Sequence, residues 1–229
     1  VYSSGAPYPG ALHDDPVCGL FRGYGIAAFG LHPVEYVPAE GKLSYYRSMD
    51  VEILTAPAER AEPSLAVRSD RTTLKRLSAM VDNPSLAADY SPMTERRTAT
   101  SLDASDACVY LIITTDAWDE YLVDFADFQT RRGLKAGIFL RSWIVANYDG
   151  RDDQERIRNF IIDAYNAWPV EDILLVGDAR DEDGIPHRGL FNSHVEATDY
   201  GIPADTYYGS LDGTWDTDSD GWWGESFPE

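Results

Sequence analysis

The chain has 229 residues, of which 44% are hydrophobic and 12% aromatic, and its 39 acidic and 19 basic residues give a formal net charge of -20. A chain of this length holds one large domain or two modest ones, and its apolar content excludes disorder over the whole chain. The acidic excess disfavours nucleic acid as a partner, because contacts to phosphates need a basic face.

Four features of the sequence bear on where the protein is found: hydrophobic runs, the N-terminal segment, the surface charge and the cysteines. No run approaches the roughly 20 apolar residues of a membrane span, so none is expected. The opening VYSSGAPYPG has neither a basic segment nor an apolar core, so we expect that a signal peptide is absent or has been removed. An acidic surface suits a calcium-rich or salty exterior, and also any soluble protein. Cys18 and Cys108 are too few for a disulfide scaffold, and we expect two separate buried thiols.

The first half of the chain is expected to be β-rich. The stretch from Phe21 to Thr55 is rich in β-branched and aromatic residues. Its alternation predicts a hairpin with strands over 34–36 and 43–45, and a further strand over 51–53. No helical period interrupts this stretch, which favours a meander or a sandwich-like sheet.

A polar, proline-containing segment follows from about Ala56 to Asp106. We interpret it as a linker or an exposed connection that contains one short helix over 72–80.

In the second half of the chain the hydrophobic residues follow a different spacing. The continuous apolar run from Val109 to Thr114 predicts a strand that is buried on both faces. A helix is expected next, with Asp116 as its N-cap and Gly133 at its end. A second strand is expected over 134–140. The apolar positions of the predicted helix are Trp118, Tyr121, Leu122, Phe125 and Phe128.

The pattern then repeats. Asp152 and Asp153 stand at the favourable end of a second helix, and a third buried strand is predicted over 173–176. The buried positions of this helix are expected to be Ile157, Phe160, Ile161, Ala164, Tyr165 and Trp168. Alternating strands and helices predict an α/β fold, with right-handed crossovers and helices that flank a parallel sheet.

Functional groups of such sheets gather at the carboxyl ends of the strands. The third predicted strand is followed there by Gly177, Asp178 and a long loop that contains His187 and His194. A loop of this length in a compact domain is functional or flexible. Asp178 and His187 are therefore candidate residues at the edge of a cleft.

The segment DTDSDGWWGE near the end of the sequence has the spacing of a calcium loop. Calcium takes six to eight oxygen ligands, and alternating aspartates followed by Gly221 at the bend supply them from one side. Phe227 stands where an EF-hand has its last glutamate, so this is not an EF-hand. The alternative is an acidic surface turn held by water. The expected ligands are Asp216, Asp218, Asp220, the carbonyl of Trp222, and Glu225.

No nucleophile is obvious in the sequence. The chain has no G-x-S-x-G, H-E-x-x-H or C-x-x-C motif and no phosphate-binding glycine loop. Cys108 opens a buried strand and is expected to be an inert core thiol. Cys18 follows His13 by five residues, but in a β-rich region without a sign of a cleft. His187 or His194 could act as a base, although no cysteine or serine obviously faces either one.

Three segments of the second half keep the order and spacing of a known family: YLIITTDAWDEYLVDFADFQTRRGLKAGIF, DILLVGDARDEDGIPHR and TDYGIPADTYYGSLDGTWDTDSDGWWGE. Over roughly Ala107 to Glu225 the chain resembles the gingipain family of cysteine peptidases. The first half is similar, more loosely, to the β-sandwich prodomain that precedes such peptidases. The residues that carry this second likeness are Phe21 to Tyr24, Pro33 to Tyr36 and Gly41 to Tyr46.

The resemblance implies a secreted zymogen with a caspase-like α/β domain, stabilised by calcium, that hydrolyses peptide bonds. Residues 1–105 would be the sandwich-like prodomain and linker, and 106–229 the first part of the peptidase domain, with an incomplete sheet. The family's Cys–His dyad lies in a Gly-His-Gly-type segment and on a later strand, and neither occurs here. We therefore assign no catalytic residue in this chain. The expected partners are a remaining C-terminal peptidase chain and a protein or peptide substrate.

Two further points stay open. Zymogens of this family are processed near the domain junction, so Arg96 and Arg97 are candidates for a processing or blocking site, unless they are solvated linker charges. The alternative function is a non-catalytic, calcium-binding surface or binding protein built on a degenerate peptidase half. The sequence encoded beyond Glu229 would distinguish this alternative from a peptidase.

Overall fold

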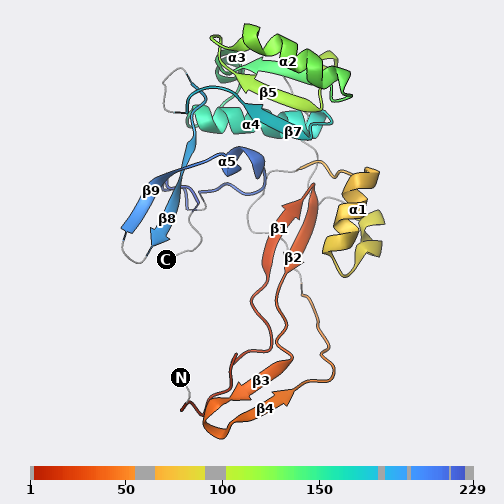
Figure 1. Cartoon of the computed structure of the whole chain (residues 1–229), viewed down its shortest axis with the longest axis vertical. Helices are drawn as coiled ribbons and strands as arrows, with labels where there is room; N and C mark the ends of the chain where they lie inside the picture. Colours follow the sequence, from red (N-terminus) through yellow and green to blue (C-terminus); the bar gives the residue numbers. More distant parts are fainter. Residues whose placement is uncertain are drawn as a thin grey trace. The chain divides into compact units, whose positions relative to one another are not determined.

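The structure, a computed structural model, describes residues 3–54, 65–90, 102–179, 184–194, 197–216 and 218–224. The chain forms two compact units (Figure 1). Unit 1 comprises residues 1–61 and 68–90, and unit 2 comprises residues 62–67 and 91–229.

Unit 1 begins with a tight antiparallel hairpin of β1 (Val17–Phe21) and β2 (Tyr24–Ala28). Its two-residue turn has positive φ angles of 50° at Arg22 and 86° at Gly23. Such angles are those of a type I′ turn, whose twist matches that of the paired strands.

A second hairpin pairs β3 (Val34–Val37) with β4 (Lys42–Tyr45), which confirms the hairpin expected over 34–36 and 43–45. Gly41 has a φ of 59° in the connecting turn, a conformation that favours glycine. Residues 51–53 form no strand, so that part of the prediction is wrong. The two hairpins are separate two-stranded sheets, and the β-sandwich stays a prediction.

Helix α1 (Arg71–Met80) confirms the short helix expected over 72–80. Asp70 is its N-cap, because one carboxylate oxygen accepts from the N–H groups of Thr72 at 2.8 Å and Thr73 at 3.0 Å. Arg22 donates to Oγ1 of Thr73 at 3.1 Å, which ties the first hairpin to this helix within unit 1.

Unit 2 contains a three-stranded parallel sheet, as the alternating pattern predicted, and its strand order is β6-β5-β7. Its strands are β5 (Tyr110–Thr114), β6 (Ala136–Leu140) and β7 (Asp172–Leu175). The central strand is the most buried of the three, and Leu111, Ile112 and Ile113 are fully buried.

Two long helices connect these strands. Helix α2 (Asp119–Arg131) joins β5 to β6, and α4 (Asp153–Ala167) lies between β6 and β7. The first crossover leads from β5 to β6 at one edge of the sheet. The second leads from β6 past β5 to β7 at the other edge. Right-handed connections in opposite directions place the two helices on opposite faces of the sheet, as Figure 1 shows.

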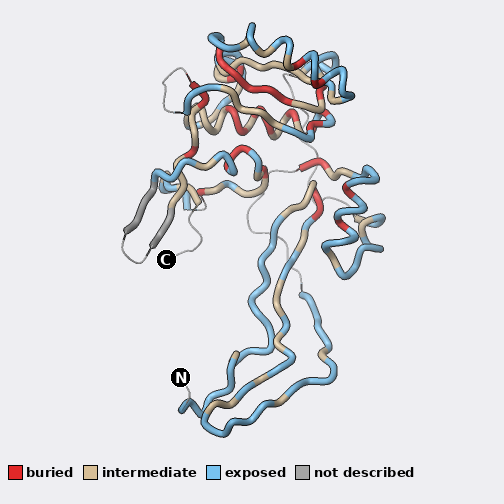
Figure 2. The backbone as a smooth tube through the Cα atoms, viewed as in Figure 1, coloured by how far each residue is buried: buried red, intermediate tan, exposed pale blue. Residues whose placement is uncertain are grey.

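The core of unit 2 lies between β5 and α4, where Figure 2 shows the densest burial. Of the six positions predicted to be buried on α4, Tyr165 is half-buried and the others are buried. Phe139 of β6 packs within this core, with ring centroids 5.1 Å from Phe160 and 5.5 Å from Trp168. The predicted buried face of α4 is therefore largely confirmed.

Helix α2 differs from its prediction in two ways. Asp116 does not cap it; its Oδ1 accepts from the Ser142 hydroxyl at 3.2 Å, and the helix begins without a side-chain cap. Trp118, Tyr121 and Phe128 are exposed rather than buried. Gly133 does follow the helix with a φ of 94°, as predicted.

Several short elements were not predicted. They are α3 (Arg141–Asn147), the hairpin of β8 (Arg188–His194) and β9 (Ala197–Ala204), α5 (Thr206–Gly209), and 3₁₀ turns at Pro38–Glu40, Pro84–Ala88 and Ala104–Asp106. The long loop after β7 thus contains a hairpin. No helix in the described parts of the chain is long and apolar enough to cross a membrane.

The predicted linker is also more ordered than expected. Leu65 and Ala66 are buried in unit 2, and the Ala66 N–H donates to Oδ1 of Asn166 on α4 at 2.7 Å. Because the residues on both sides are polar, the sequence pattern does not indicate that this short segment is packed.

We predict that Ile161→Val lowers the free energy of unfolding by about 0.5–1.5 kcal/mol, because Ile161 is fully buried under the sheet. The same change at the half-buried neighbour Ile162 is the matched control and should cost less. Urea unfolding of both variants measures the difference, and equal costs would contradict the placement of the core.

Candidate functional site

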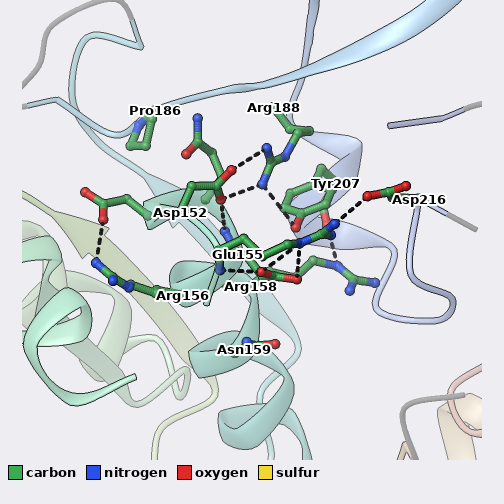
Figure 3. A network of polar contacts seen from close by, with 12 residues as sticks. Asp152, Glu155, Arg156, Arg158, Asn159, Pro186, Arg188, Tyr207 and Asp216 are labelled. Atoms are coloured by element: carbon green, nitrogen blue, oxygen red, sulfur yellow. Dashed lines mark hydrogen bonds and ion pairs between the residues drawn. The ribbon is translucent and has the colours of Figure 1, made fainter. Parts of the chain in front are cut away.

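A network of charged side chains joins the start of α4 to the segments that follow β7 (Figure 3). Asp152 is the N-cap of α4, and its Oδ1 accepts from the N–H of Glu155 at 2.9 Å. The same carboxylate accepts two hydrogen bonds from Arg188 of β8, at 2.7 and 2.8 Å. This paired geometry is the strong form of a charge-assisted contact.

Burial and hydrogen bonding together determine the ionisation of Asp152 and Arg188. Burial alone disfavours ionised Asp152, but the hydrogen bonds from Arg188 and from the Glu155 N–H outweigh it and lower the pKa of the carboxyl. Burial likewise disfavours the Arg188 cation, and its bonds to Asp152 outweigh this and raise its pKa. Both groups are therefore ionised at neutral pH. Burial raises the pKa of Tyr207, which lies beside Arg188 and stays neutral.

Arg188 is also held by aromatic rings. Its guanidinium lies 4.6 Å from the ring centroid of Tyr207 and 3.8 Å from that of Trp223. Cation–π contacts of this kind are strongest where water is excluded, and Arg188 is buried. One arginine therefore fixes the start of β8, α5 and the segment around Trp223 against the start of α4.

A second buried arginine, Arg158, interrupts the apolar face of α4. Its Nε donates to the carbonyl of Tyr207 at 3.0 Å, and its Nη2 donates to the carbonyls of Ser210 and Asp212, each at 3.0 Å. These carbonyls belong to α5 and to the segment that follows it. The cation therefore holds this irregular backbone on the helix.

A third arginine, Arg151, reaches the predicted calcium loop. It donates to Glu155 at 3.1 and 3.2 Å, and it pairs with Oδ2 of Asp216, whose side chain is fully buried. Its guanidinium also lies 5.2 Å from the ring centroid of Trp223. The first residue of the loop is thus fixed to the start of α4.

The carboxylates of Asp216, Asp218 and Asp220 lie together, each offering an oxygen within 4.8 Å of the others. Asp216 Oδ1 is buried and has no hydrogen-bond partner among the described residues. A buried carboxylate oxygen without a donor is costly, so this atom favours a cation at the centre of the cluster. Hard carboxylate oxygens are the ligands that calcium prefers, and the donor set fits that ion.

The backbone of the loop is folded for this arrangement. The N–H of Asp220 donates to Asp218 at 3.2 Å, and the N–H of Trp222 donates to Asp220 at 2.7 Å. Gly221 bends the chain with a φ of 92°. The N–H of Trp222 thus points into the loop. Glu225, the fifth predicted ligand, lies outside the described residues.

The loop is closed onto β8. The N–H of Phe191 donates to the carbonyl of Trp223, and the N–H of Gly224 donates to the carbonyl of Trp215, both at 2.7 Å. A Cβ on Gly224 would lie 3.3 Å from Cβ of Leu190, and its φ is 85°, so glycine fits this close approach.

The other candidate residues take no part in this network. Asp178 is exposed, and His187 is half-buried with Nδ1 3.2 Å from the carbonyl oxygen of Ala179. The structure thus brings the segments of Asp178 and His187 together, but the imidazole contacts backbone. Arg96 and Arg97 lie outside the described residues.

Neither cysteine has the surroundings of a nucleophile. Cys108 is almost fully buried, and burial raises the pKa of its thiol to about 11, so it is a neutral thiol at physiological pH. Cys18 is exposed in unit 1, which corrects the expectation that both thiols are buried. Among the side chains that the structure describes, no hydrogen bond joins a cysteine to a histidine.

A groove of about 540 Å³ lies elsewhere, along the free edge of β6. Its lining includes Ile138, Phe139, Leu140 and Trp143, and none of the charged network. Ser105, Asp106 and Lys135 also line the groove, and the Lys135 ammonium donates to the carbonyl of Ser105 at 3.1 Å. None of the described residues that line it is a cysteine or a histidine, so we do not place the chemistry there.

The sequence did not single out Arg151, Arg158, Arg188 or Tyr207. Two signals could have pointed to them: a basic residue inside the apolar stripe of α4, and basic residues next to aspartates in an otherwise acidic chain. Their partners could not be found this way, because Arg158 and Arg188 contact residues 19 to 55 positions away.

The chain was compared with models of protein families. The model of peptidase family C25 matches residues 103–228, which is more than half of the chain and covers the sheet, the arginine network and the aspartate loop. The curated proteins and the solved structures gave no match.

We predict that Asp152→Asn lowers the free energy of unfolding at pH 7 by about 1–2 kcal/mol, because the charged pair with Arg188 is lost while asparagine still caps the helix. The pKa of Asp152 is lowered in the folded state, so its contribution is present above the unfolded pKa and disappears as pH falls through the folded pKa. The difference between wild type and variant should therefore shrink below about pH 4.

Urea unfolding at pH 7, 4 and 3 measures this effect. Asp149→Asn is the control, because Asp149 has an exposed side chain in the same connection. A difference that stays constant down to pH 3 would mean that the charge of Asp152 does not stabilise the fold.

Proposed function

Since the chain belongs to peptidase family C25, the gingipain family, we propose that it is the N-terminal portion of a secreted, gingipain-like cysteine endopeptidase zymogen. The reaction is hydrolysis of peptide bonds in proteins or peptides. A thiolate that has lost its proton to a histidine attacks the peptide carbonyl, the C–N bond breaks, and the amine leaves with that proton. Water then hydrolyses the thioester of the acyl-enzyme, which releases the acid and restores the thiol. The family match over residues 103–228 carries this proposal.

We place the Cys–His dyad downstream of this chain, on a further segment or chain packed against unit 2. The support is chemical: Cys108 is a buried neutral thiol, and His187 contacts a backbone carbonyl. In this proposal unit 2 is a scaffold for the catalytic groups. Unit 1 serves as the prodomain, with Arg96 and Arg97 as a processing or blocking site near the junction.

We further propose that the sheet of unit 2 continues into a caspase-like sheet at β7. The free edge of β6 is partly satisfied, since the N–H of Ala136 donates to Oγ1 of Thr130 on α2 at 3.1 Å. Natural sheets protect their outer edges in this way. Further strands are therefore better accommodated beside β7, next to the arginine network.

Calcium at Asp216, Asp218 and Asp220, with the carbonyl of Trp222 and Glu225 as further ligands, is part of the proposal. The support is the unpartnered, buried Oδ1 of Asp216 and the short separation of the three carboxylates. The ion would be structural, because it joins carboxylates that otherwise repel one another.

We predict that the 229-residue chain alone neither hydrolyses casein nor reacts with a peptidyl acyloxymethyl ketone, whereas the protein extended by the sequence encoded after Glu229 does both. Cys108→Ala in the extended protein should keep activity per folded molecule within about two-fold, because a buried neutral thiol does not act as the nucleophile. Fluorogenic peptides and intact mass measure both effects.

Cys18→Ala is the matched control. Activity of the short chain that disappears with either cysteine substitution would overturn the placement of the dyad. Failure of the extended protein to cleave any peptide or react with the probe would leave the non-catalytic calcium-binding role as the better description.

For calcium, we predict that about 10 mM of the ion stabilises the folded chain by about 1.4–2.7 kcal/mol, as expected for a site of roughly 10⁻⁴ to 10⁻³ M affinity. Asp218→Asn combined with Asp220→Asn should abolish this effect. Urea unfolding measures it, and terbium luminescence sensitised by Trp222 reports the site directly.

Asp124→Asn combined with Asp127→Asn is the charge-matched control, because both residues are exposed on α2. If the two double variants respond to calcium equally, the ion acts by screening the acidic surface and the loop is an ordinary turn.

A further inference from the structure

The second hairpin of unit 1 has two chemically different faces. In its register Val34 lies opposite Tyr45, and Tyr36 lies opposite Leu43. Side chains of directly opposed residues share a face, and the face alternates along each strand. These four apolar or aromatic residues therefore lie together, while Glu35, Val37, Lys42 and Ser44 occupy the other face.

Tyr8 extends the apolar face. It pairs with Tyr36 by two backbone hydrogen bonds of 2.9 Å in an antiparallel bridge, so its side chain lies beside that of Tyr36. The opposite face has a polar contact of its own, as the Tyr46 hydroxyl donates to Glu35 at 2.8 Å. We call the set Tyr8, Val34, Tyr36, Leu43 and Tyr45 the tyrosine face.

The tyrosine face is exposed in the described structure. Tyr8 is 74% exposed, Leu43 67% and Tyr45 64%, and Val34 and Tyr36 are 44% and 37% exposed. No side chain of β3 or β4 is buried, and Figure 2 shows the hairpin largely in the colour of exposed residues. An amphipathic hairpin normally packs its apolar face on a core and exposes its polar face.

From this geometry we propose that the tyrosine face is a homodimer interface, on which the same face of a second copy packs about a two-fold axis. Three half- or fully exposed tyrosines and two aliphatic side chains offer on the order of 500 Å² per copy. Two copies then bury on the order of 1,000 Å², which is the lower limit for a specific interface.

The chemistry of the face fits a copy of itself. It carries no charged side chain, so burial against an identical face places no like charges opposite one another. Tyrosine rings pack on one another while their hydroxyls reach the rim, which is why tyrosine is enriched at interfaces. Two-fold symmetry requires only that the face be self-complementary.

The charge of the whole chain makes this dimer dependent on salt. Two chains of formal net charge -20 repel one another, and salt screens that repulsion. Sodium chloride should therefore shift the chain from monomer toward dimer.

The test is the mass of the full chain in solution, by light scattering and sedimentation at 0.1 and 2 M sodium chloride. We expect monomers at low salt and dimers at high salt. Leu43→Thr combined with Tyr45→Thr should raise the dimer dissociation constant at least about ten-fold, because two apolar side chains leave the interface. Lys42→Thr combined with Ser44→Thr, on the polar face of the same strand, should leave it within about two-fold.

A second measurement does not depend on these variants folding well. In a Cys18→Ala background, Tyr36→Cys at the centre of the face should form a disulfide-linked dimer on mild oxidation, whereas Glu35→Cys on the opposite face should not. A chain that remains monomeric at 2 M salt, or variants of both faces that dimerise equally, would overturn the proposal and leave the face to another partner.

Discussion

The structure of unit 2 depends on one carboxylate, that of Asp152. It caps α4 through the N–H of Glu155 and at the same time binds both terminal nitrogens of Arg188. Helix N-termini favour negative charge, and a buried guanidinium requires it, so each role strengthens the other. Because the same atoms serve both, the start of α4 and the start of β8 cannot shift independently. Arg188 also contacts the rings of Tyr207, which precedes the predicted calcium loop in sequence, and of Trp223, which lies within it.

The distribution of charge in unit 2 follows from this arrangement. The chain has only 19 basic residues against 39 acidic ones, yet two of its arginines are buried beside α4. Buried cations are tolerated only when carboxylates or carbonyls satisfy them. Arg158 fulfils this condition through backbone carbonyls of the segment after α5, and Arg188 through Asp152. The irregular chain between α5 and Gly224 thus has a fixed position without a large apolar core of its own.

The sequence predicted what its local patterns encode. The apolar run of β5 and the apolar positions of α4 predicted the parallel sheet and its core. The spacing of the aspartates predicted that their carboxylates lie together, and they do. The same reasoning was wrong about Trp118 and Tyr121, because a helical apolar period shows that a helix has an apolar face and not what covers it. Asp116 contacts Ser142 instead of capping α2. Apart from the local pair of Arg151 with Glu155, the arginine contacts could not be predicted, since they join segments that are distant in sequence and are brought together only by the fold.

The two oxygens of Asp216 have different roles in the proposed calcium site. Oδ2 pairs with Arg151, whereas Oδ1 is buried without a partner. Arg151 therefore holds the first ligand in position before an ion arrives, which reduces the ordering that binding requires. The same guanidinium is a fixed positive charge beside the cluster, and it repels the ion that it helps to position. The pre-organisation of Asp216 raises the affinity for calcium, whereas the repulsion between Arg151 and the ion lowers it. The carboxylates of Asp218 and Asp220 are exposed and add little rigidity to the site. A site built in this way belongs to the weak range typical of extracellular calcium, which agrees with the secreted peptidase proposed for this chain.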